Sequence, residues 1–288
     1  MQNYKYEKEK AVITKTGIEF FLQRMAPDHS SVHPHLHSAL EFLFITKGKF
    51  LMFADDREVY ANEGSTVFFR SNTVHKIFAL NEGESYYYVL KLKPSVIMDL
   101  CSPEHCGQYL LSLALNRSEQ KIFWSAAESE KNGMSAAIAA IADEYGRGET
   151  GYDMAVRSQT ARVLLAVLRS SNDECTEGND VPDETLRRIY DTAVYINSHY
   201  AENLTASELA ARAFMSYSYF SRCFARVTGK NFKQYLNTTR INRAEKELYT
   251  TDKSVTRIAA DCGFSNLSYF ISVYKKHKGV TPYSVRKK

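Results

Sequence analysis

The sequence predicts a two-domain α+β protein, in which an antiparallel β-barrel with accompanying helices is followed by an all-α domain that holds two helix-turn-helix units. Three observations support this fold class. Short alternating segments broken by turn residues fill residues 39–93, helical periodicity takes over after Pro94, and one late stretch recurs at an offset of 49 to 50 residues. With 288 residues, of which 44% are hydrophobic, the chain can bury a core in each domain.

Composition narrows the class of protein. The first ten residues are charged with no apolar run behind them, and the longest aliphatic cluster, VLLAVL at 163–168, is far too short to cross a bilayer, so we expect neither export nor a membrane partner. The five cysteines are scattered and form no C-x-x-C pair, which is typical of reduced thiols in the cytoplasm. A redox pair of Cys101 and Cys106 is the alternative that spacing leaves open.

The net charge of +4 conceals an asymmetry. Residues 184–288 carry 18 lysines and arginines against 8 acidic residues, a net charge of +10, whereas the first 183 residues carry a net charge of −6. A basic domain joined to an acidic one indicates that the basic part binds a polyanion such as nucleic acid. A merely solvated basic face is the alternative that charge alone leaves open.

In the first domain, which we place at residues 1–100, the segments between turn residues have the length and alternation of β-strands. Short strands at this spacing favour a small antiparallel barrel or sandwich. The expected strands are residues 39–47, 49–54, 57–61, 65–69, 73–80 and 86–93.

The chain then becomes helical. Residues 135–145 and 154–170 are rich in alanine and leucine with helical periodicity, so we assign 101–170 to helices that pack on the barrel and form a homodimer through ARVLLAVLR at 161–169. The following residues, 171–183, are polar and acidic with a glycine and a proline, which is typical of a linker. The second domain therefore spans residues 184–288.

This second domain contains an internal repeat. Residues 209–232 and 258–282 share an aliphatic-alanine start, a turn, a Tyr-Phe pair, a later aromatic residue and a glycine, at an offset of 49 before the turn and 50 after it. Two copies of one helix-turn-helix unit explain the pattern. The helix predicted between them, 232–250, has Ile241 and Leu248 at core spacing and would hold the two copies rigidly.

In the first copy, Thr205 and Glu208 form a capping box for a short helix, and Ser216 caps the next one. The outward side chains expected on that second helix are Tyr217, Ser218, Ser221, Arg222 and Ala225. A helix presented with its polar N-terminal side chains outward suits the major groove of DNA. The side chains expected in the core, and not stacked on bases, are Tyr219, Phe220, Phe224, Tyr269 and Phe270.

In the second copy Gly263 provides a turn position that tolerates positive φ, and Ser265 is expected to cap the reading helix. The outward side chains expected there are Asn266, Leu267, Ser268, Ile271 and Ser272. Lys275, Lys276 and Lys278 follow, where DNA phosphates would lie. The two reading helices would then enter successive major grooves of double-stranded DNA, about one helical turn apart.

These residues carry a resemblance to a known family. The second copy contains I-A-x-x-x-G-F, S-Y-F, an aromatic residue followed by Lys, G-x-T-P and a terminal Arg, and the last hundred residues resemble the DNA-binding domain of AraC/XylS-type bacterial transcription regulators. The base-reading positions that the resemblance implies are Ser218, Ser221, Arg222, Ser268 and Ser272. The sequence departs from the family pattern at Ser272, where members often carry Arg, and at Ile271, so backbone contact and DNA shape are the alternative role for the second helix.

The stretch HPHLHSALEFLFITKGKF, residues 33–50, raises a second question. His35, His37 and Glu41 share odd numbering, so on one strand their side chains would point together into the barrel. His75, on a later strand, is a fourth candidate. These side chains have the chemistry either of a metal site or of a polar pocket.

The same stretch resembles the cupin barrel, because residues 35–48 satisfy H-x-H-x3-E-x6-G and His75 keeps part of the second cupin motif. Arg70 and Asn72 replace the usual proline and glycine of that motif. The resemblance implies three imidazoles and one carboxylate, a set that suits a divalent metal such as Fe, Mn, Ni or Zn. An effector pocket shaped by the same side chains without a metal is the alternative that we favour.

Together the two resemblances predict a cytoplasmic transcription regulator that is not an enzyme, in which the cupin-like domain senses a small-molecule effector and the helical domain binds promoter DNA. They imply a sugar or related metabolite as effector, with Tyr86, Tyr87 or Tyr88 near enough to stack on its ring, and RNA polymerase as a further partner. Two alternatives stay open. One is a metal-dependent cupin enzyme with an accessory nucleic-acid-binding tail, and the other is an effector-free activator whose barrel serves only dimerisation.

Overall fold

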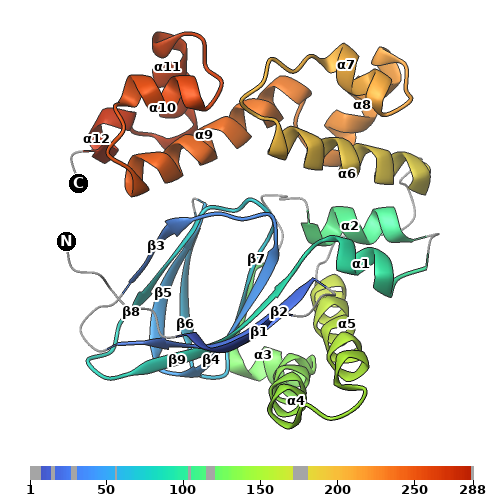
Figure 1. The fold of residues 1–288 in the computed structure, drawn as a ribbon, viewed down its shortest axis with the longest axis vertical. Helices are drawn as coiled ribbons and strands as arrows, with labels where there is room; N and C mark the ends of the chain where they lie inside the picture. Colours follow the sequence, from blue (N-terminus) through green and yellow to red (C-terminus); the bar gives the residue numbers. More distant parts are fainter. Residues whose placement is uncertain are drawn as a thin grey trace. The chain divides into compact units, whose positions relative to one another are not determined.

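The computed structural model describes residues 8–13, 17–26, 31–55, 57–102, 105–114, 121–170 and 181–286. The chain divides into two compact units with the main boundary near residue 178 (Figure 1). Among the described residues, no helix is both long enough and apolar enough to span a membrane.

The strands of the first unit form two sheets. The larger sheet has the order β1-β2-β9-β4-β7-β10, and the smaller one has the order β3-β8-β5-β6. Neighbouring strands pair in antiparallel fashion, for example β4 with both β7 and β9, and β5 with both β6 and β8. The strands are β1 (Lys8–Ile13), β2 (Ile18–Met25), β3 (Ser31–His35), β4 (Leu40–Lys47), β5 (Lys49–Ala54), β6 (Arg57–Asn62), β7 (Thr66–Phe69), β8 (His75–Ala79), β9 (Ser85–Leu92) and β10 (Phe123–Trp124).

The two-residue alternation of each strand decides which side chains enter the core. On β5, Phe50 and Met52 are buried, whereas Lys49, Leu51 and Phe53 point to the other face. The inward side chains of both sheets meet in one apolar cluster, which includes Phe21, Met25, Leu43, Ile45, Val67, Phe69, Ile77, Tyr87 and Val89. The prediction of an antiparallel barrel-like first domain is therefore confirmed.

The six strands expected from the sequence are confirmed as β4 to β9, with ends that differ by at most two residues. The sequence analysis missed β1, β2, β3 and β10. β3 contains Pro34 and two histidines, and β10 is only two residues long, so neither carries a clear alternating signal.

Among the described residues of the first unit, five helices accompany the sheets. They are α1 (Ser95–Leu100), α2 (Cys106–Ala114), α3 (Ala126–Lys131), α4 (Met134–Arg147) and α5 (Tyr152–Ser170). α4 packs against the larger sheet, because Phe20 of β2 stacks on Tyr145 of α4 with ring centroids 5.3 Å apart (Figure 1). Within the described residues no disulfide joins Cys101 and Cys106.

The segment expected to mediate dimerisation lies on α5. Within it Val163, Leu164 and Val167 are buried inside the first unit, and Leu165 keeps 40% of its surface exposed. Most of the apolar surface of this segment is therefore already used by the fold of one chain.

The second unit is helical. Its helices are α6 (Asp183–Ser198), α7 (Ala206–Arg212), α8 (Tyr217–Thr228), α9 (Phe232–Thr250), α10 (Val255–Asp261), α11 (Leu267–Lys278) and α12 (Pro282–Arg286). Figure 1 shows α7 and α8 at one end of α9, and α10 and α11 at the other. These two pairs are the predicted helix-turn-helix copies, and α9 has the bounds expected from the sequence.

The helix starts follow the predicted capping chemistry. Thr205 and Glu208 form the capping box of α7, and the Ser216 side chain accepts a hydrogen bond from the backbone N–H of Tyr219 at the start of α8. A second capping box, Asn231 with Gln234, starts α9 and was not predicted from the sequence.

Candidate nucleic-acid interface and histidine cluster

α8 presents two different faces. Phe220 and Phe224 are fully buried, while Tyr217, Ser218 and Arg222 are exposed. Ser221 and Ala225 lie half-buried between these faces. A helix fixed by one face and free on the other can insert its free face into a DNA groove.

α11 repeats the arrangement with a different cap. Ser268 and Ser272 are exposed, and Phe270 is fully buried. The cap predicted at Ser265 is wrong, because the Asn266 side chain accepts the hydrogen bond from the Tyr269 backbone N–H, 2.9 Å away. The side-chain oxygen of Asn266 is therefore occupied as the N-cap acceptor, and its amide N–H groups remain available as donors to a partner.

Leu267 and Ile271 of α11, which were expected to face outward, pack partly against the core cluster of the second helix-turn-helix copy. Of the tyrosines expected in the core, Tyr219 is half-buried, whereas Tyr269 is 43% exposed and its hydroxyl accepts a hydrogen bond from Asn237 Nδ2 at 2.9 Å. Core packing is thus confirmed for the phenylalanines and wrong for Tyr269. The Tyr269 hydroxyl gives it a polar partner at the surface, which a phenylalanine would not need.

The three lysines at the end of α11 divide by environment. Lys275 and Lys276 are exposed, as a phosphate contact requires. The Lys278 ammonium lies 2.9 Å from the Glu245 carboxylate of α9, and the two side chains are only 10% and 15% exposed. The prediction of a phosphate contact for Lys278 is therefore wrong, because this lysine is bound in an ion pair between α9 and α11.

Two arginines tie the second unit together. Arg240 of α9 donates hydrogen bonds to the carbonyl groups of Tyr200 and Glu202, at 2.7 and 2.8 Å. Arg286, the terminal arginine of the sequence motif, donates to the carbonyl of Leu248 in the last turn of α9 and to that of Lys253 beyond it, at 2.9 and 2.6 Å. These bonds tie the segment after α6 to α9, and α12 to the end of α9.

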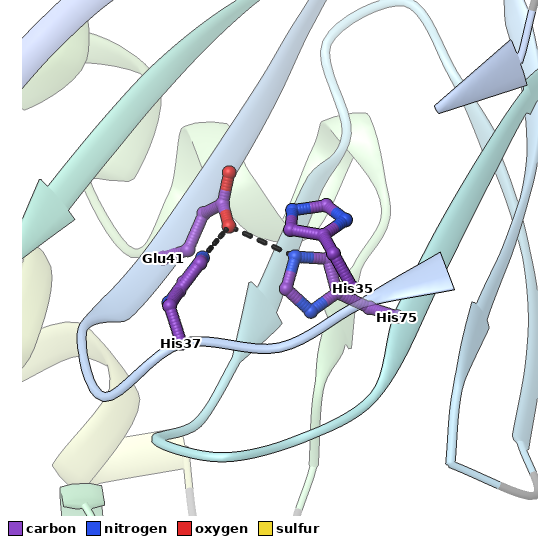
Figure 2. A group of neighbouring side chains, drawn as sticks. All are labelled: His35, His37, Glu41 and His75. Atoms are coloured by element: carbon purple, nitrogen blue, oxygen red, sulfur yellow. Dashed lines mark hydrogen bonds and ion pairs between the residues drawn. The ribbon is translucent and has the colours of Figure 1, made fainter. Parts of the chain in front are cut away.

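The second candidate site is a group of four side chains on and beside β3, β4 and β8. His35, His37, Glu41 and His75 each offer a ligand atom, and these atoms all lie within 4.8 Å of one another. Figure 2 shows one carboxylate oxygen of Glu41 bridging two rings, with His37 Nε2 at 2.7 Å and His75 Nε2 at 3.0 Å. The sequence analysis named all four residues, and the structure brings them together.

The route by which they meet differs from the prediction. His35 ends β3, His37 follows in the connecting segment, and Glu41 lies on β4, so the three do not share one strand. His75 begins β8. Convergence comes from a turn between two strands that belong to different sheets, which odd numbering alone cannot predict.

Electrostatics favour the ionised form of Glu41. Burial alone would raise its pKa, but hydrogen bonds from His37 and His75, together with the charges of His75 and Lys91, hold the pKa well below its ordinary value. Lys91 Nζ lies 3.4 Å from the second carboxylate oxygen. The sequence analysis missed Lys91, although its parity with Tyr87 and Val89 on β9 could have placed it on the inward face.

The hydrogen bonds of His37 orient its ring. Its Nδ1 lies 3.1 Å from the Ala39 carbonyl oxygen, and its Nε2 lies 2.7 Å from the Glu41 carboxylate. A contact of Nδ1 with a backbone carbonyl that leaves Nε2 facing the site is the arrangement common among metal-binding histidines.

The donor set fits a first-row divalent metal. Bonds of about 2.0–2.2 Å place two ligands of one ion at most about 4.4 Å apart, so ligand atoms within 4.8 Å of one another need only a small contraction. Three imidazoles and one carboxylate are suitable ligands for Zn, Fe, Mn or Ni. The chain can therefore hold such an ion with His35, His37, Glu41 and His75.

Next to this polar group the barrel interior is apolar. Phe69 stacks on His75 with ring centroids 4.3 Å apart, and Tyr87 is buried against Phe50. Tyr86 and Tyr88 point to the opposite face of β9, where Tyr88 stacks on Phe20. Of the three tyrosines considered for stacking on a sugar, only Tyr87 points inward, and it is packed in the core.

Comparison with known proteins adds to these observations. A cupin domain model matches residues 21–91, and a helix-turn-helix domain model matches residues 209–288. The chain is 22% identical over 254 residues to the HTH-type transcriptional regulator YdeC of Bacillus subtilis, which covers 88% of this chain and 85% of that protein.

Two further similarities concern one stretch of the chain and its overall fold. A 104-residue stretch is 36% identical to the HTH-type transcriptional regulator SAR0107 of Staphylococcus aureus, and it covers 36% of this chain but only 14% of that protein. The structure of ToxT from Vibrio cholerae matches with a TM-score of 0.50 at 15% identity over 94% of this chain and 98% of that one. At this identity the likeness concerns the fold alone.

Proposed function

We propose that this chain, a transcription regulator of the AraC type in which a cupin-like domain is joined to a DNA-binding helix-turn-helix domain, recognises promoter DNA with α8 and α11 and responds to a small-molecule effector through its barrel. One observation carries the DNA proposal. Two copies of one helix-turn-helix unit stand at the ends of α9, and each has a reading helix with a buried face and an exposed polar face.

The exposed residues suggest different roles for α8 and α11 in binding DNA. Arg222 on α8 can form a bidentate contact with a guanine, and Tyr217, Ser218 and Ser221 would accompany it. On α11 the short side chains of Asn266, Ser268 and Ser272 would discriminate between bases less strongly than Arg222 does, with Leu267 at the edge of the contact. Lys275 and Lys276 would bind phosphates. The net charge of +10 over residues 184–288 supplies the long-range attraction to DNA.

The test starts by selecting DNA duplexes from a random pool with the full chain, and then measures affinity by fluorescence anisotropy at several salt concentrations. Arg222→Ala is expected to weaken binding to the selected duplex about 10- to 100-fold and to relax its sequence preference. Lys276→Ala is expected to weaken binding to all duplexes alike and to reduce the salt slope by about 1.

The matched control is Arg147→Ala at the exposed end of α4, which removes only a surface ion pair with Asp143 and should leave DNA affinity unchanged. Equal losses on selected and random duplexes in Arg222→Ala would contradict its role as a base reader. No selected sequence at all would contradict the DNA proposal as a whole.

For the barrel we propose an effector site that includes His35, His37, Glu41 and His75, with or without a divalent metal. The proximity of four ligand atoms supports the metal, and the acceptors and donors of the same group would also suit the hydroxyl groups of a sugar. A sugar remains our first effector class because of the family resemblance. Isothermal titration with monosaccharides and their derivatives tests it, and Glu41→Gln is expected to abolish any binding found.

Elemental analysis by mass spectrometry tests the metal. The protein is purified without a metal-affinity column and compared with the triple variant His35→Ala, His37→Ala, His75→Ala. Near-stoichiometric metal that disappears in the variant would support a metal site, and the same trace level in both would leave these side chains as pocket walls. Metal content also tests the competing proposal, a metal-dependent cupin enzyme with an accessory nucleic-acid-binding tail. The activity of such an enzyme would not be affected by the DNA-binding defect of Arg222→Ala.

Three further proposals complete this function. The first is a homodimer, since regulators that bind paired sites commonly act as dimers, and size measurement in solution tests it. The second is RNA polymerase as the partner of an activator, which a two-component binding assay tests. The third is a cytoplasmic location, which the reduced cysteines suit and cell fractionation tests.

A further inference from the structure

In the described part of the first unit, no helix covers the outer face of the smaller sheet (Figure 1). The outward residues of β5, β6 and β8 follow the strict alternation of these strands. They form a three-by-three grid in which Leu51 is central, which we call the outer grid. Figure 1 shows α3 and α4 beside the other sheet.

The register defines the rows of the outer grid. Across β6, β5 and β8 the rows are Tyr60–Leu51–Phe78, Glu58–Phe53–Lys76 and Asn62–Lys49–Leu80. Tyr60 is 66% exposed and Leu80 is 44% exposed, while the three side chains in the middle of the apolar area, Leu51, Phe53 and Phe78, are half-buried. Adjoining apolar and aromatic side chains on an open sheet face are typical of an interaction site.

The charges of the outer grid are incomplete. Glu58 and Lys76 flank Phe53 on opposite sides, and because they stand two strands apart, about 10 Å, they do not pair with each other. Within the described part of the chain neither of them forms an ion pair. The Lys76 ammonium lies 4.1 Å above the Phe78 ring, and partial burial without a nearby carboxylate lowers its pKa.

A second copy of the outer grid supplies the missing partners. When two such faces pack with a two-fold axis parallel to β5, the β6 column of one copy lies over the β8 column of the other. Glu58 then meets Lys76 of the second copy, and Lys76 meets its Glu58. Tyr60 likewise meets Phe78, and Leu51 and Phe53 meet their own counterparts.

We propose that the outer grid is a homodimer interface in which two chains pack sheet to sheet about this axis. Lys49, at one end of the β5 column, meets the Lys49 of the second copy at the rim of the interface, where both long side chains can turn to solvent. The grid has nine residues, fewer than the ~20–30 per partner of a standard interface, so the association is weak and depends on concentration.

Charge reversal tests the interface on the full chain by sedimentation velocity over ~1–200 µM, the range in which small interfaces dissociate. The unchanged protein is expected to show a reversible monomer–dimer equilibrium. Glu58→Lys and Lys76→Glu, each alone, place like charges opposite each other and are expected to raise the dissociation constant at least ~10-fold. The double variant Glu58→Lys, Lys76→Glu restores opposite charges and should return to within ~3-fold of the original value.

Mixing the two single variants gives a second readout. One carries two lysines and the other two glutamates at these positions, so an equimolar mixture is expected to form heterodimers although each variant alone is monomeric. The control is Glu130→Lys on the exposed side of α3, which should not change association. Circular dichroism of each variant excludes unfolding as the cause of a lost dimer.

Three outcomes would overturn the proposal. The first is an unchanged protein that is monomeric at every concentration. The second is a dimer that both single charge reversals leave intact, as a dimer through α5 would be. The third is a folded double variant that does not recover dimerisation. None of them affects DNA recognition by α8 and α11, which is tested separately with Arg222→Ala.

Discussion

Lys278 and Lys276 show how neighbours decide what a charged residue does. Both lie in the last turns of α11, where positive charge also favours the helix dipole. Lys276 points to solvent and is available to a phosphate, whereas Lys278 is enclosed with Glu245. The sequence KKHK could not distinguish them, because the difference depends on which side of α11 faces α9.

The first prediction separates the two lysines. Lys278→Ala removes the ammonium that lies 2.9 Å from the Glu245 carboxylate in a mostly enclosed position, so the free energy of unfolding is expected to fall by about 1–3 kcal/mol. Lys276→Ala is expected to change it by less than about 0.5 kcal/mol. Urea denaturation measures both, and equal stability of the two variants would contradict the role of the ion pair.

The second prediction concerns acid. The pKa of Glu41 is lower in the folded chain than in the unfolded one, so its contribution to stability is present above the unfolded pKa of about 4.3 and is lost as the pH falls through the folded pKa. Glu41→Gln is therefore expected to cost about 1–3 kcal/mol at pH 7. The difference from the unchanged protein should shrink once the pH falls below about 4.

Denaturant titrations at pH 7, 5 and 3.5, in the presence of a chelator, measure this difference. A gap between the two proteins that stays constant over this range would mean that the Glu41 charge does not contribute. His75→Phe, which keeps a ring against Phe69, is a companion variant that removes one donor to Glu41.

At the scale of elements, the repeat explains the turns of both helix-turn-helix copies. Phe214 and Gly263 are equivalent positions at an offset of 49, and both adopt positive φ, +56° and +84°. At Gly263 a Cβ atom would lie 2.7 Å from the Ala201 carbonyl oxygen, so glycine is required there both by conformation and by space. Phe214 is 84% exposed and takes the same left-handed conformation, in which its Cβ atom causes strain that glycine avoids.

The third prediction therefore has opposite signs in the two copies. Gly263→Ala is expected to lower the free energy of unfolding by about 1–3 kcal/mol, because the turn and the Ala201 segment must both shift. Phe214→Gly is expected to raise it by about 0.5 kcal/mol, because it relieves a strained conformation at little loss of packing. Thermal denaturation measures both, and a stabilised Gly263→Ala variant would contradict the close approach.

Sequence pattern predicted most elements but not all of them. α9 and the caps at Thr205 and Ser216 follow from local chemistry, since capping and helical periodicity depend on residues within one turn. The cap of α11 could not be assigned in this way, because Ser265 and Asn266 are adjacent and equally suited. The histidine group was found by motif, yet its geometry depends on a turn and on the pairing of distant strands.

At the scale of the whole molecule, each unit has its own core. The second unit contains an apolar cluster formed by α9, α10 and α11, with Ile241, Ile258 and Phe270 fully buried. A unit with its own core is expected to fold by itself. This separation suits the proposed function, because the proposed effector site and the proposed DNA-reading helices can then change independently.

The fourth prediction follows from this separation. A fragment of residues 181–288 is expected to unfold in one cooperative thermal transition and to bind the selected duplex within about 10-fold of the full chain. Circular dichroism and anisotropy measure these properties, with the Arg222→Ala fragment as the non-binding control. An unfolded fragment would show that the second unit depends on the rest of the chain.

α9 has a consequence for the promoters themselves. Its 19 residues make a rod about 28 Å long, and one continuous rod sets a fixed separation between the two reading helices. Each inserted base pair turns the second half of a binding site by about 34° around the duplex. If both helices read DNA as proposed, promoters can accumulate base substitutions over evolutionary time, above all opposite the serines of α11, but they can hardly gain or lose a single base pair between the halves.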